Sequence, residues 1–246
     1  MENTLLIGLS RQVALARELD VIANNMANVN TNGFKARSSL FAEYIMPEAT
    51  ADEFPLPDRS FSYVIDNGTP LDFSTGALER TGNPMDVAIK GEAFFAVETP
   101  NGERYTRNGA LQLDQDGRLV TSDGWPILGD GGEIVFNPEE TGISIGRDGA
   151  VSTDQGQRGR IRLVRFEDVQ ALKNEGANVF SSEAPGLPAL ETSKIESGVI
   201  ERSNVNAVIE MSRMMEVNRS YTAIANTLQR LAELQRTAVQ RLGEAV

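Results

Sequence analysis

Cysteine and histidine are both absent from this chain of 246 residues. Without cysteine there are no disulfides and no thiol nucleophiles, and without histidine there is no imidazole base and no ligand of the kind that zinc sites use most often. These absences exclude most hydrolase and metalloenzyme mechanisms. We therefore expect no catalytic residue, no metal site, no cofactor and no small-molecule substrate.

Long apolar runs are missing as well. No segment approaches the roughly 20 apolar residues that a membrane-spanning helix needs. Residues 1–12, "MENTLLIGLSRQ", contain only a short apolar patch and do not match a cleavable secretory signal. We expect a soluble chain without membrane insertion, which leaves the cytoplasm, if it does so, without a cleaved signal peptide.

Positive charge is scarce in the centre of the chain. The net charge is −12, yet residues 1–40 and residues 199–246 each carry +1, so the segment between them carries −14. An acidic centre disfavours nucleic acid and anionic membrane surfaces as partners. The near-neutral ends, in contrast, can pack closely without large self-repulsion.

Mostly apolar residues at the two ends recur at alternating steps of four and three, which is typical of a coiled-coil seam. Ser203, followed by Asn204, supplies an N-cap signal for the second helix. That helix needs a partner, either the N-terminal helix of the same chain or the same pair in a neighbouring molecule. An ordinary helical hairpin inside a monomer fits the pattern equally well. The two series are Leu5, Leu9, Gln12, Ala16, Leu19, Ala23 and Met26, and then Ala207, Glu210, Met214, Val217, Tyr221, Ile224, Leu228, Leu231, Gln235, Ala238 and Leu242.

The residues between these helices have a β pattern. Short apolar runs alternate with Asn-Gly or Asp-Gly pairs at residues 101, 108, 116 and 123, and such pairs supply the positive φ values of tight hairpin turns. We predict an α+β fold, in which the N- and C-terminal helices pair as a coiled-coil-like domain and the centre is a mostly antiparallel β domain. The predicted parts are residues 1–35 and 199–246 (the two halves of the helical domain), 36–80 (an extended connector with room for one hairpin) and 81–198 (the β domain).

Two features of the β region resemble binding sites weakly. Asp114, Asp116 and Asp123 resemble part of a calcium loop, but the glutamate at the twelfth position of such a loop is missing. We interpret these carboxylates as turn residues. Trp125 is the only tryptophan, and we interpret it as a hairpin core residue rather than a sugar-stacking platform.

Asparagine is concentrated in one stretch, "NNMANVNTNGFKA", at the end of the first helix. Asn32-Gly33 is a suitable helix stop, because both residue types tolerate the left-handed conformation, but a stop explains only one or two amides. A buried amide needs partners for donors and acceptors alike, which suits a surface that must keep register against other protein. We predict that the amides set register between packed neighbours. They belong to Asn24, Asn25, Asn28, Asn30 and Asn32.

Three stretches resemble one protein family. "ANNMANVNTNGFKA" resembles the N-terminal signature of the flagellar basal-body rod and hook family, which runs Ala-Asn-Asn-Leu-Ala-Asn-Val-Asn-Thr-x-Gly-Phe-Lys, with Met26 in place of the usual leucine. "VIERSNVNAVIEMSRMMEVNRSYTAIANTLQRL" resembles the family's closing motif, and "TGNPMDVAIKGEAFFAV" and "YTRNGALQLDQDGRLVTSDGWPILG" resemble its β domain. The resemblance spans nearly the whole chain, and its length and compact middle are most like a proximal rod member.

The resemblance implies a structural protein rather than an enzyme: a subunit of the bacterial flagellar basal-body rod, which polymerises through its terminal helices into the axial drive shaft and export tube. It implies as partners other rod proteins, copies of the same chain and the flagellar type III export apparatus, and a location in the rod within the periplasmic space. The predicted assembly interface consists of Leu9, Leu19, Asn24, Asn25, Asn28, Asn30, Gly33, Phe34, Asn204, Asn206, Met214, Tyr221, Ile224, Leu228 and Leu231.

Two alternatives stay open at this point. A distal rod or hook-family subunit is the close alternative within the family. From another class, a monomeric carbohydrate-binding or adhesive β module on a helical stalk would bind a ligand saturably through Trp125 or Tyr105, whereas a rod subunit needs no small ligand.

Overall fold

The computed structural model describes residues 2–46, 61–66 and 68–244. The part of the predicted connector on residues 47–60 and 67 lies outside the described residues. The helices are α1 (Glu2–Ala27), α2 (Ala207–Glu244) and the short 3-10 helix η1 (Val169–Ala171). The strands are β1 (Phe41–Met46), β2 (Phe61–Asp66), β3 (Leu78–Arg80), β4 (Val87–Lys90), β5 (Phe94–Thr99), β6 (Gly102–Thr106), β7 (Leu111–Leu113), β8 (Leu119–Thr121), β9 (Leu128–Gly129), β10 (Gly132–Glu133), β11 (Ser144–Ile145), β12 (Ala150–Thr153), β13 (Gly156–Arg160), β14 (Leu163–Arg165), β15 (Lys173–Asn174), β16 (Val179–Ser181), β17 (Leu187–Pro188), β18 (Lys194–Ser197) and β19 (Val199–Glu201).

The chain forms two compact units. The helical unit consists of residues 1–27, 37–71 and 206–246, and the β unit consists of residues 28–36 and 72–205. Helices at both ends and an antiparallel β centre confirm the predicted α+β fold class. The contact-based boundary after residue 27 differs from the sequence-based boundary after residue 35, because the helical pattern locates the end of a helix and not the surface on which the following residues pack.

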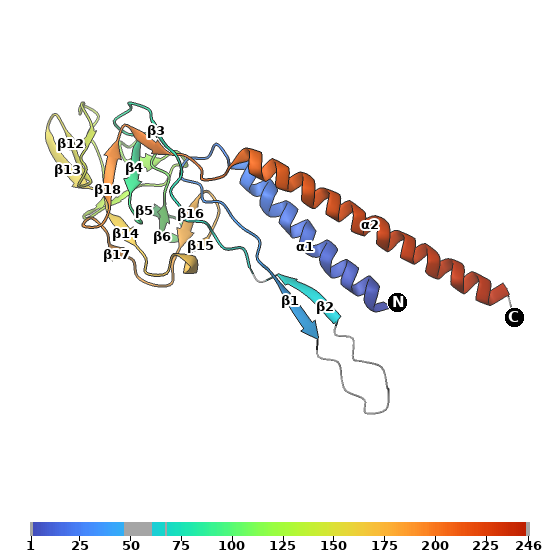
Figure 1. Cartoon of the computed structure of the whole chain (residues 1–246). Helices are drawn as coiled ribbons and strands as arrows, with labels where there is room; N and C mark the ends of the chain where they lie inside the picture. The colour runs from blue at the N-terminus through green and yellow to red at the C-terminus, as the bar shows by residue number, and fades with distance from the viewer. Residues whose placement is uncertain (1, 47–60, 67, 245–246) are drawn as a thin grey trace. The chain divides into compact units, whose positions relative to one another are not determined.

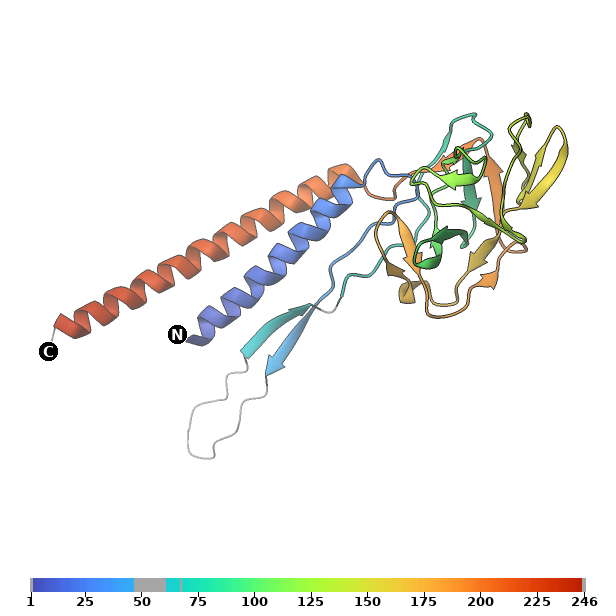
Figure 2. The same ribbon diagram turned by 180° about the vertical axis from the view of Figure 1, so that it is seen from behind.

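In the helical unit, α1 and α2 lie side by side, as the two views of Figures 1 and 2 agree. Gly8 of α1 lies against Leu228 of α2, because an added Cβ at residue 8 would lie 2.6 Å from Leu228 Cδ2. The predicted seam of α2 is the less exposed face of that helix from residue 207 to residue 235, and Val217 is 5% exposed. The hairpin of β1 and β2 belongs to the same unit, and β2 also contacts α1.

The predicted seam of the first helix was wrong by about one position. Among residues 6–27 of α1, for which burial is described, Ala14, Ile22 and Asn25 are buried, whereas Leu9 and Ala23 are exposed. The N-terminal half of α1 is apolar on several sides, so residue spacing alone does not predict which of these faces is buried. The buried face of α1 is set by its contacts with both α2 and β2.

Asn206 is the N-cap of α2. Its Oδ1 accepts hydrogen bonds from the backbone N–H groups of Val208 (3.1 Å) and Ile209 (3.2 Å). The prediction of Ser203 as the cap was wrong, because Ser203 Oγ accepts from the N–H of Val205 (3.2 Å) before the helix begins. The stretch "SNVN" offers three side chains of the capping type, and sequence does not rank them.

An Asn206→Ala substitution is expected to reduce the stability of α2 by about 0.5 to 2 kcal/mol, because two N–H groups of the first turn lose their acceptor. Circular dichroism and amide exchange of residues 207–212 measure the loss. Asn226, exposed in the middle of α2, provides the control: Asn226→Ala is expected to favour the helix slightly, because alanine has the higher helix propensity. Equal effects at the two positions would contradict the cap assignment.

The β unit is built around a six-stranded antiparallel sheet in the order β15-β16-β6-β5-β14-β17. Its core includes fully buried side chains on β5, β8 and β14, such as Phe95, Leu119 and Leu163. Two further antiparallel pairs, β18 with β4 and β19 with β3, bring residues 194–201 alongside residues 78–90. This pairing places Glu201, at the end of β19, in the interior.

Three of the four predicted glycine turns have the expected backbone. Gly102, Gly117 and Gly124 have positive φ values. The prediction was wrong at Gly109, whose φ is not positive; instead, an added Cβ there would lie 1.7 Å from the carbonyl oxygen of Val87. Glycine is needed at that position for close approach of two backbone segments and not for a hairpin turn.

Candidate functional site

The asparagine-rich stretch divides at the end of α1. The helix stops at Ala27, and the motif segment, defined as Asn28–Ala36, packs as part of the β unit. Its residues Phe34 and Lys35 are 5% and 1% exposed. Residues 33–35 of the motif segment are therefore buried in the β unit and are not a surface extension of the helix.

Backbone and amide groups hold the motif segment in place. The N–H of Gly33 donates to the carbonyl oxygen of Glu201 at 2.7 Å. The carbonyl oxygen of Asn32 accepts from Asn178 Nδ2 at 2.8 Å, and Asn32 Oδ1 accepts from Arg202 Nη1 at 3.2 Å. Gly33 has φ +68, and an added Cβ would lie 2.4 Å from the carbonyl carbon of Arg107. Glycine is required here for two reasons: the backbone is left-handed, and a side chain would clash with the backbone of Arg107.

A buried charge cluster lies beneath the motif segment. Lys35 Nζ is 2.6 Å from Glu201 Oε1, with both side chains at most 1% exposed. Arg107 Nη1 is 3.4 Å from Glu201 Oε2. Glu201 thus faces two cations, and its Oε1 also accepts the N–H of Gly76 at 3.0 Å. We call Lys35, Arg107 and Glu201 the charge cluster.

Each of the two cations also donates to a backbone carbonyl group. Lys35 Nζ donates to the carbonyl oxygen of Ser74 at 2.7 Å, and Arg107 Nη2 donates to that of Gly91 at 2.7 Å. The guanidinium of Arg107 lies 5.1 Å from the ring centroid of Phe94, in a cation–π arrangement. These contacts offset much of the cost of burying the two cations, since an unpaired buried charge is strongly unfavourable. Arg107 Nε is the exception: it is buried without a hydrogen-bond partner among the described residues.

Burial lowers the pKa of Lys35 from its ordinary value, and the attraction of Glu201 opposes that shift. Burial likewise lowers the pKa of Arg107, again opposed mainly by Glu201. A lysine with a lowered pKa is a common nucleophile, but the side chain of Lys35 is 0% exposed and no substrate can reach it. The charge cluster is a structural element and not a reaction centre.

Asn204 ties the segment before α2 to the motif segment. Its Oδ1 accepts from the N–H of Ala36 at 2.7 Å, and its Nδ2 donates to the carbonyl oxygen of Asp72 at 2.8 Å. The N–H of Asp72 in turn donates to the carbonyl oxygen of Ala36 at 2.8 Å. Three chain segments that are distant in sequence therefore meet at one amide side chain.

Asn25 plays a similar part inside the helical unit. Its Nδ2 donates to the carbonyl oxygen of Arg37 at 2.8 Å, and its Oδ1 accepts from the N–H of Arg37 at 2.9 Å. The side chain is 1% exposed. These two hydrogen bonds satisfy the donor and the acceptor of the Asn25 amide, as a backbone partner in a β-ladder would. At least this side chain of the asparagine-rich stretch is therefore bonded within the chain.

The predicted interface residues fall into three groups in the structure. Some are engaged inside their own unit, namely Asn25, Asn28, Gly33, Phe34, Asn204 and Asn206. Some are partly buried positions of the helical unit, namely Leu19, Met214, Tyr221, Ile224, Leu228 and Leu231. The exposed ones are Leu9, Asn24 and Asn30.

Sequence reasoning missed the charge cluster. Lys35 and Glu201 are 166 residues apart, and no spacing rule links them. One signal was present: Glu201 directly follows the apolar pair Val199 and Ile200, and all three residues of this strand are buried. An acid inside a buried strand needs a cationic partner, although the sequence does not say which cation supplies it.

Trp125 and Tyr105, the two aromatic residues suggested for ligand binding, pack against other residues of the β unit. Trp125 packs against the core of the β unit, as predicted, and Tyr105 is 9% exposed with its ring 4.7 Å from that of Phe166. Asp114 accepts from the N–H groups of Asp116 and Arg118, as expected of a turn residue. Within residues 2–46, 61–66 and 68–244, no group of acidic side chains is arranged to hold a metal ion, and no helix is long and apolar enough to cross a membrane.

Three family models match separate parts of the chain. Residues 5–35 match "Flagella basal body rod protein", residues 88–153 match "Flagellar hook protein FlgE/F/G D1 domain", and residues 196–241 match "Flagellar basal body rod FlgEFG protein C-terminal". The first of these matches contains the motif segment up to Lys35, and the last contains Glu201.

Curated relatives match over nearly the full length. The flagellar basal-body rod protein FlgF of Caulobacter vibrioides is 40% identical over 247 residues, which cover 99% of each chain. FlgF of Mesorhizobium japonicum is 33% identical, again over 99% of each chain. The flagellar basal-body rod protein FlgG of Bacillus subtilis is 32% identical over 96% of this chain and 100% of its own.

Proposed function

Because the chain belongs to the flagellar basal-body rod protein family, is most like FlgF and is a structural subunit of the rod, we propose that it polymerises through its terminal helices into the axial drive shaft and export tube. Neighbouring copies and other rod proteins are the partners in this assembly. The proposal extends to a location in the periplasmic space, to export by the flagellar type III apparatus without a cleaved signal, and to the absence of enzymatic activity.

The observation that carries the polymerisation proposal is the apolar surface of the helices. Eight large apolar side chains of α1 and α2 are between about half and three-quarters exposed. Exposed apolar residues that are concentrated on two elements mark a protein contact surface. They are Leu6, Leu9, Val13, Val208, Ile209, Met211, Met215 and Leu234.

Hydrogen bonds inside the β unit support a second part of the proposal, the passage of torque between the two units. The chain crosses between them after residues 27, 36, 71 and 205. In the β unit, the residues beside these crossings are joined to one another, since Asn204 bonds to Ala36 and Asp72 and Gly33 bonds to Glu201. We propose that force is shared among all crossings instead of acting on one strand of chain.

A gene deletion tests the proposed function. Cells that lack this chain are expected to form basal bodies that stop short of a full rod, and a plasmid copy is expected to restore full rods and swimming. Electron microscopy of purified basal bodies is the measurement. Full rods in the deletion strain would contradict the proposal.

A Leu234→Glu variant is expected to fold normally but not to enter the rod. Leu234 is 65% exposed in the chain, so the change should alter the free energy of unfolding by no more than about 0.5 kcal/mol. In a packed helix layer, the same carboxylate would lose its water and oppose assembly. Gln229→Glu, an equal charge change at another exposed position of α2, tests whether charge alone explains the loss. Normal rod incorporation of Leu234→Glu would place residue 234 outside the interface.

A further inference from the structure

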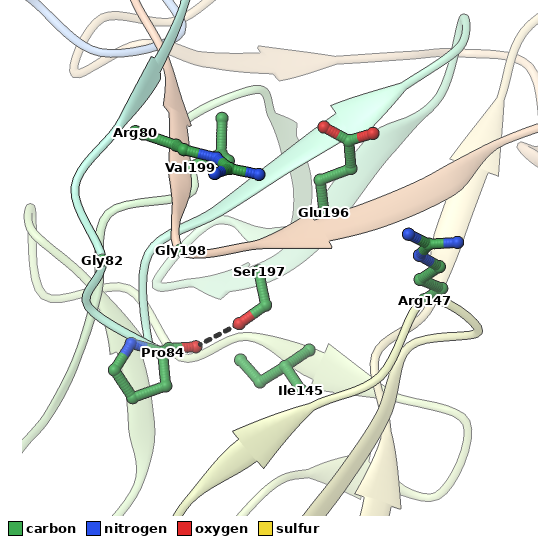
Figure 3. Close-up of a pocket in the computed structure, with 9 residues that line it drawn as sticks. All are labelled: Arg80, Gly82, Pro84, Ile145, Arg147, Glu196, Ser197, Gly198 and Val199. Carbon is green, nitrogen blue, oxygen red and sulfur yellow. Dashed lines mark hydrogen bonds between the residues drawn. The ribbon is translucent and has the colours of Figure 1, made fainter.

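A hollow of about 570 Å³ opens on the β unit, between β3, β11 and β18. Arg80 from β3, Glu196 from β18 and Arg147 line it, and Figure 3 draws Glu196 between the two arginines in this view. A neighbouring hollow shares Arg147 and Glu196 and adds Lys90 and Lys194. We call these five side chains the basic groove. It holds four cations and one carboxylate in a chain whose net charge is −12.

The cations of the basic groove differ from most other cations of the β unit that are at least partly exposed. Seven of those others have a carboxylate partner in the chain, and Arg165 is the exception among the described residues. In the groove, Lys90 is 3.9 Å from Glu196, and among the described residues Arg80, Arg147 and Lys194 have no carboxylate within ion-pair distance. The partnered cations are Arg104, Arg118, Arg158, Arg160, Arg162, Lys173 and Arg202.

The lining of the first hollow also contains an apolar side chain and two glycines. Ile145 lies in its lining with Gly82 and Gly198, and Ser197 Oγ donates to the carbonyl oxygen of Pro84 at 3.0 Å. A polypeptide segment can lie in such a hollow and place carboxylates against the rim. Clustered cations around a concave surface attract a ligand of opposite charge and fix its register.

We propose that the basic groove binds the acidic segment of residues 47–60 from a neighbouring copy in the rod. That segment reads "PEATADEFPLPDRS" and carries four carboxylates against one arginine, a net charge of −3. The groove carries +3, so the net charge of the segment equals that of the groove in size and is opposite in sign. The inference rests on the proposed polymerisation, which brings copies together.

Cysteine cross-linking tests the contact directly, because the chain has no cysteine of its own. Arg147→Cys and Asp52→Cys copies are expressed together in cells that lack the native copy, and basal bodies are purified and oxidised. A disulfide-linked dimer that a reductant removes is expected for this pair. Each variant alone, and Asp52→Cys with Lys173→Cys, are the controls, since Lys173 is exposed but lies outside the groove and pairs with Glu183. No dimer above the level of the controls would overturn the inference.

Charge reversal supplies a second readout. Arg147→Glu is expected to lower the amount of the chain in purified basal bodies, and Asp52→Arg in the same chain is expected to restore it at least partly, because the pair is then reversed and again complementary. Lys173→Glu is the control and is expected to leave incorporation unchanged. If the unaltered chain is present in basal bodies but the cross-link or the rescue is absent, the groove inference fails. If the unaltered chain is itself absent from the rod, the proposed function fails.

Discussion

A Glu201→Ala variant is expected to lose about 3 to 5 kcal/mol of stability in the β unit, the cost typical of removing one partner from a buried ion pair. The substitution leaves the ammonium of Lys35 and the guanidinium of Arg107 buried without their carboxylate. It also leaves the N–H of Gly76 without its acceptor. Urea unfolding followed by the fluorescence of Trp125, the single tryptophan and part of the β unit, measures the change.

Glu79→Ala is the matched control for this prediction. Glu79 lies on the strand paired with β19, and its carboxylate is 2.6 Å from Arg202 with an exposed side chain. An exposed ion pair of this kind contributes little to stability, because water screens the two charges. A loss in Glu201→Ala no greater than that of Glu79→Ala would mean that the charge cluster does not stabilise the fold.

The second large effect is expected for Gly33→Val, with a loss of about 2 to 5 kcal/mol from the sum of two causes. The left-handed backbone at φ +68 is unfavourable for a β-branched residue, and the new Cβ would lie 2.4 Å from the backbone of Arg107. We expect the motif segment to be displaced from the β unit. Both the unfolding free energy and the amount of chain in basal bodies should fall.

Gly124→Val separates the two causes. Gly124 has φ +87, but an added Cβ there would have nothing within 4 Å. Only the conformational cost of about 1 to 2 kcal/mol is therefore expected. Equal losses at residues 33 and 124 would show that the contact with Arg107 is unimportant.

Local patterns in the sequence predicted the elements well where one physical signal dominated. The seam of α2 around Leu228 follows from period and apolarity, and the turns at Gly102 and Gly117 follow from glycine chemistry. The α+β class follows because the helical pattern lies at the two ends of the chain and the turn pattern lies between them. The start of α2 could not be placed from the sequence, because "SNVN" holds several side chains of the capping type. Only the structure identifies Asn206 as the cap.

The charge cluster could not be predicted from such patterns. Its three members come from the motif segment, from the residue after β6 and from β19, and long-range pairing between single charges leaves no periodic trace. The amides show the same limit. Their density predicted a need for hydrogen-bond partners, and the structure supplies some of these inside the chain, at Asn25 and Asn32, while a role between subunits stays a prediction.

Amide hydrogen exchange of the motif segment in the full-length chain tests the central claim, that this segment is anchored in the β unit. The N–H groups of Gly33 and Ala36 are bonded to Glu201 and Asn204, so we predict exchange as slow as that of core amides such as Ala96 on β5, since both report opening of the same unit. Exchange of Gly33 and Ala36 within about tenfold of the rate of an unstructured peptide, with Ala96 still protected, would contradict the account.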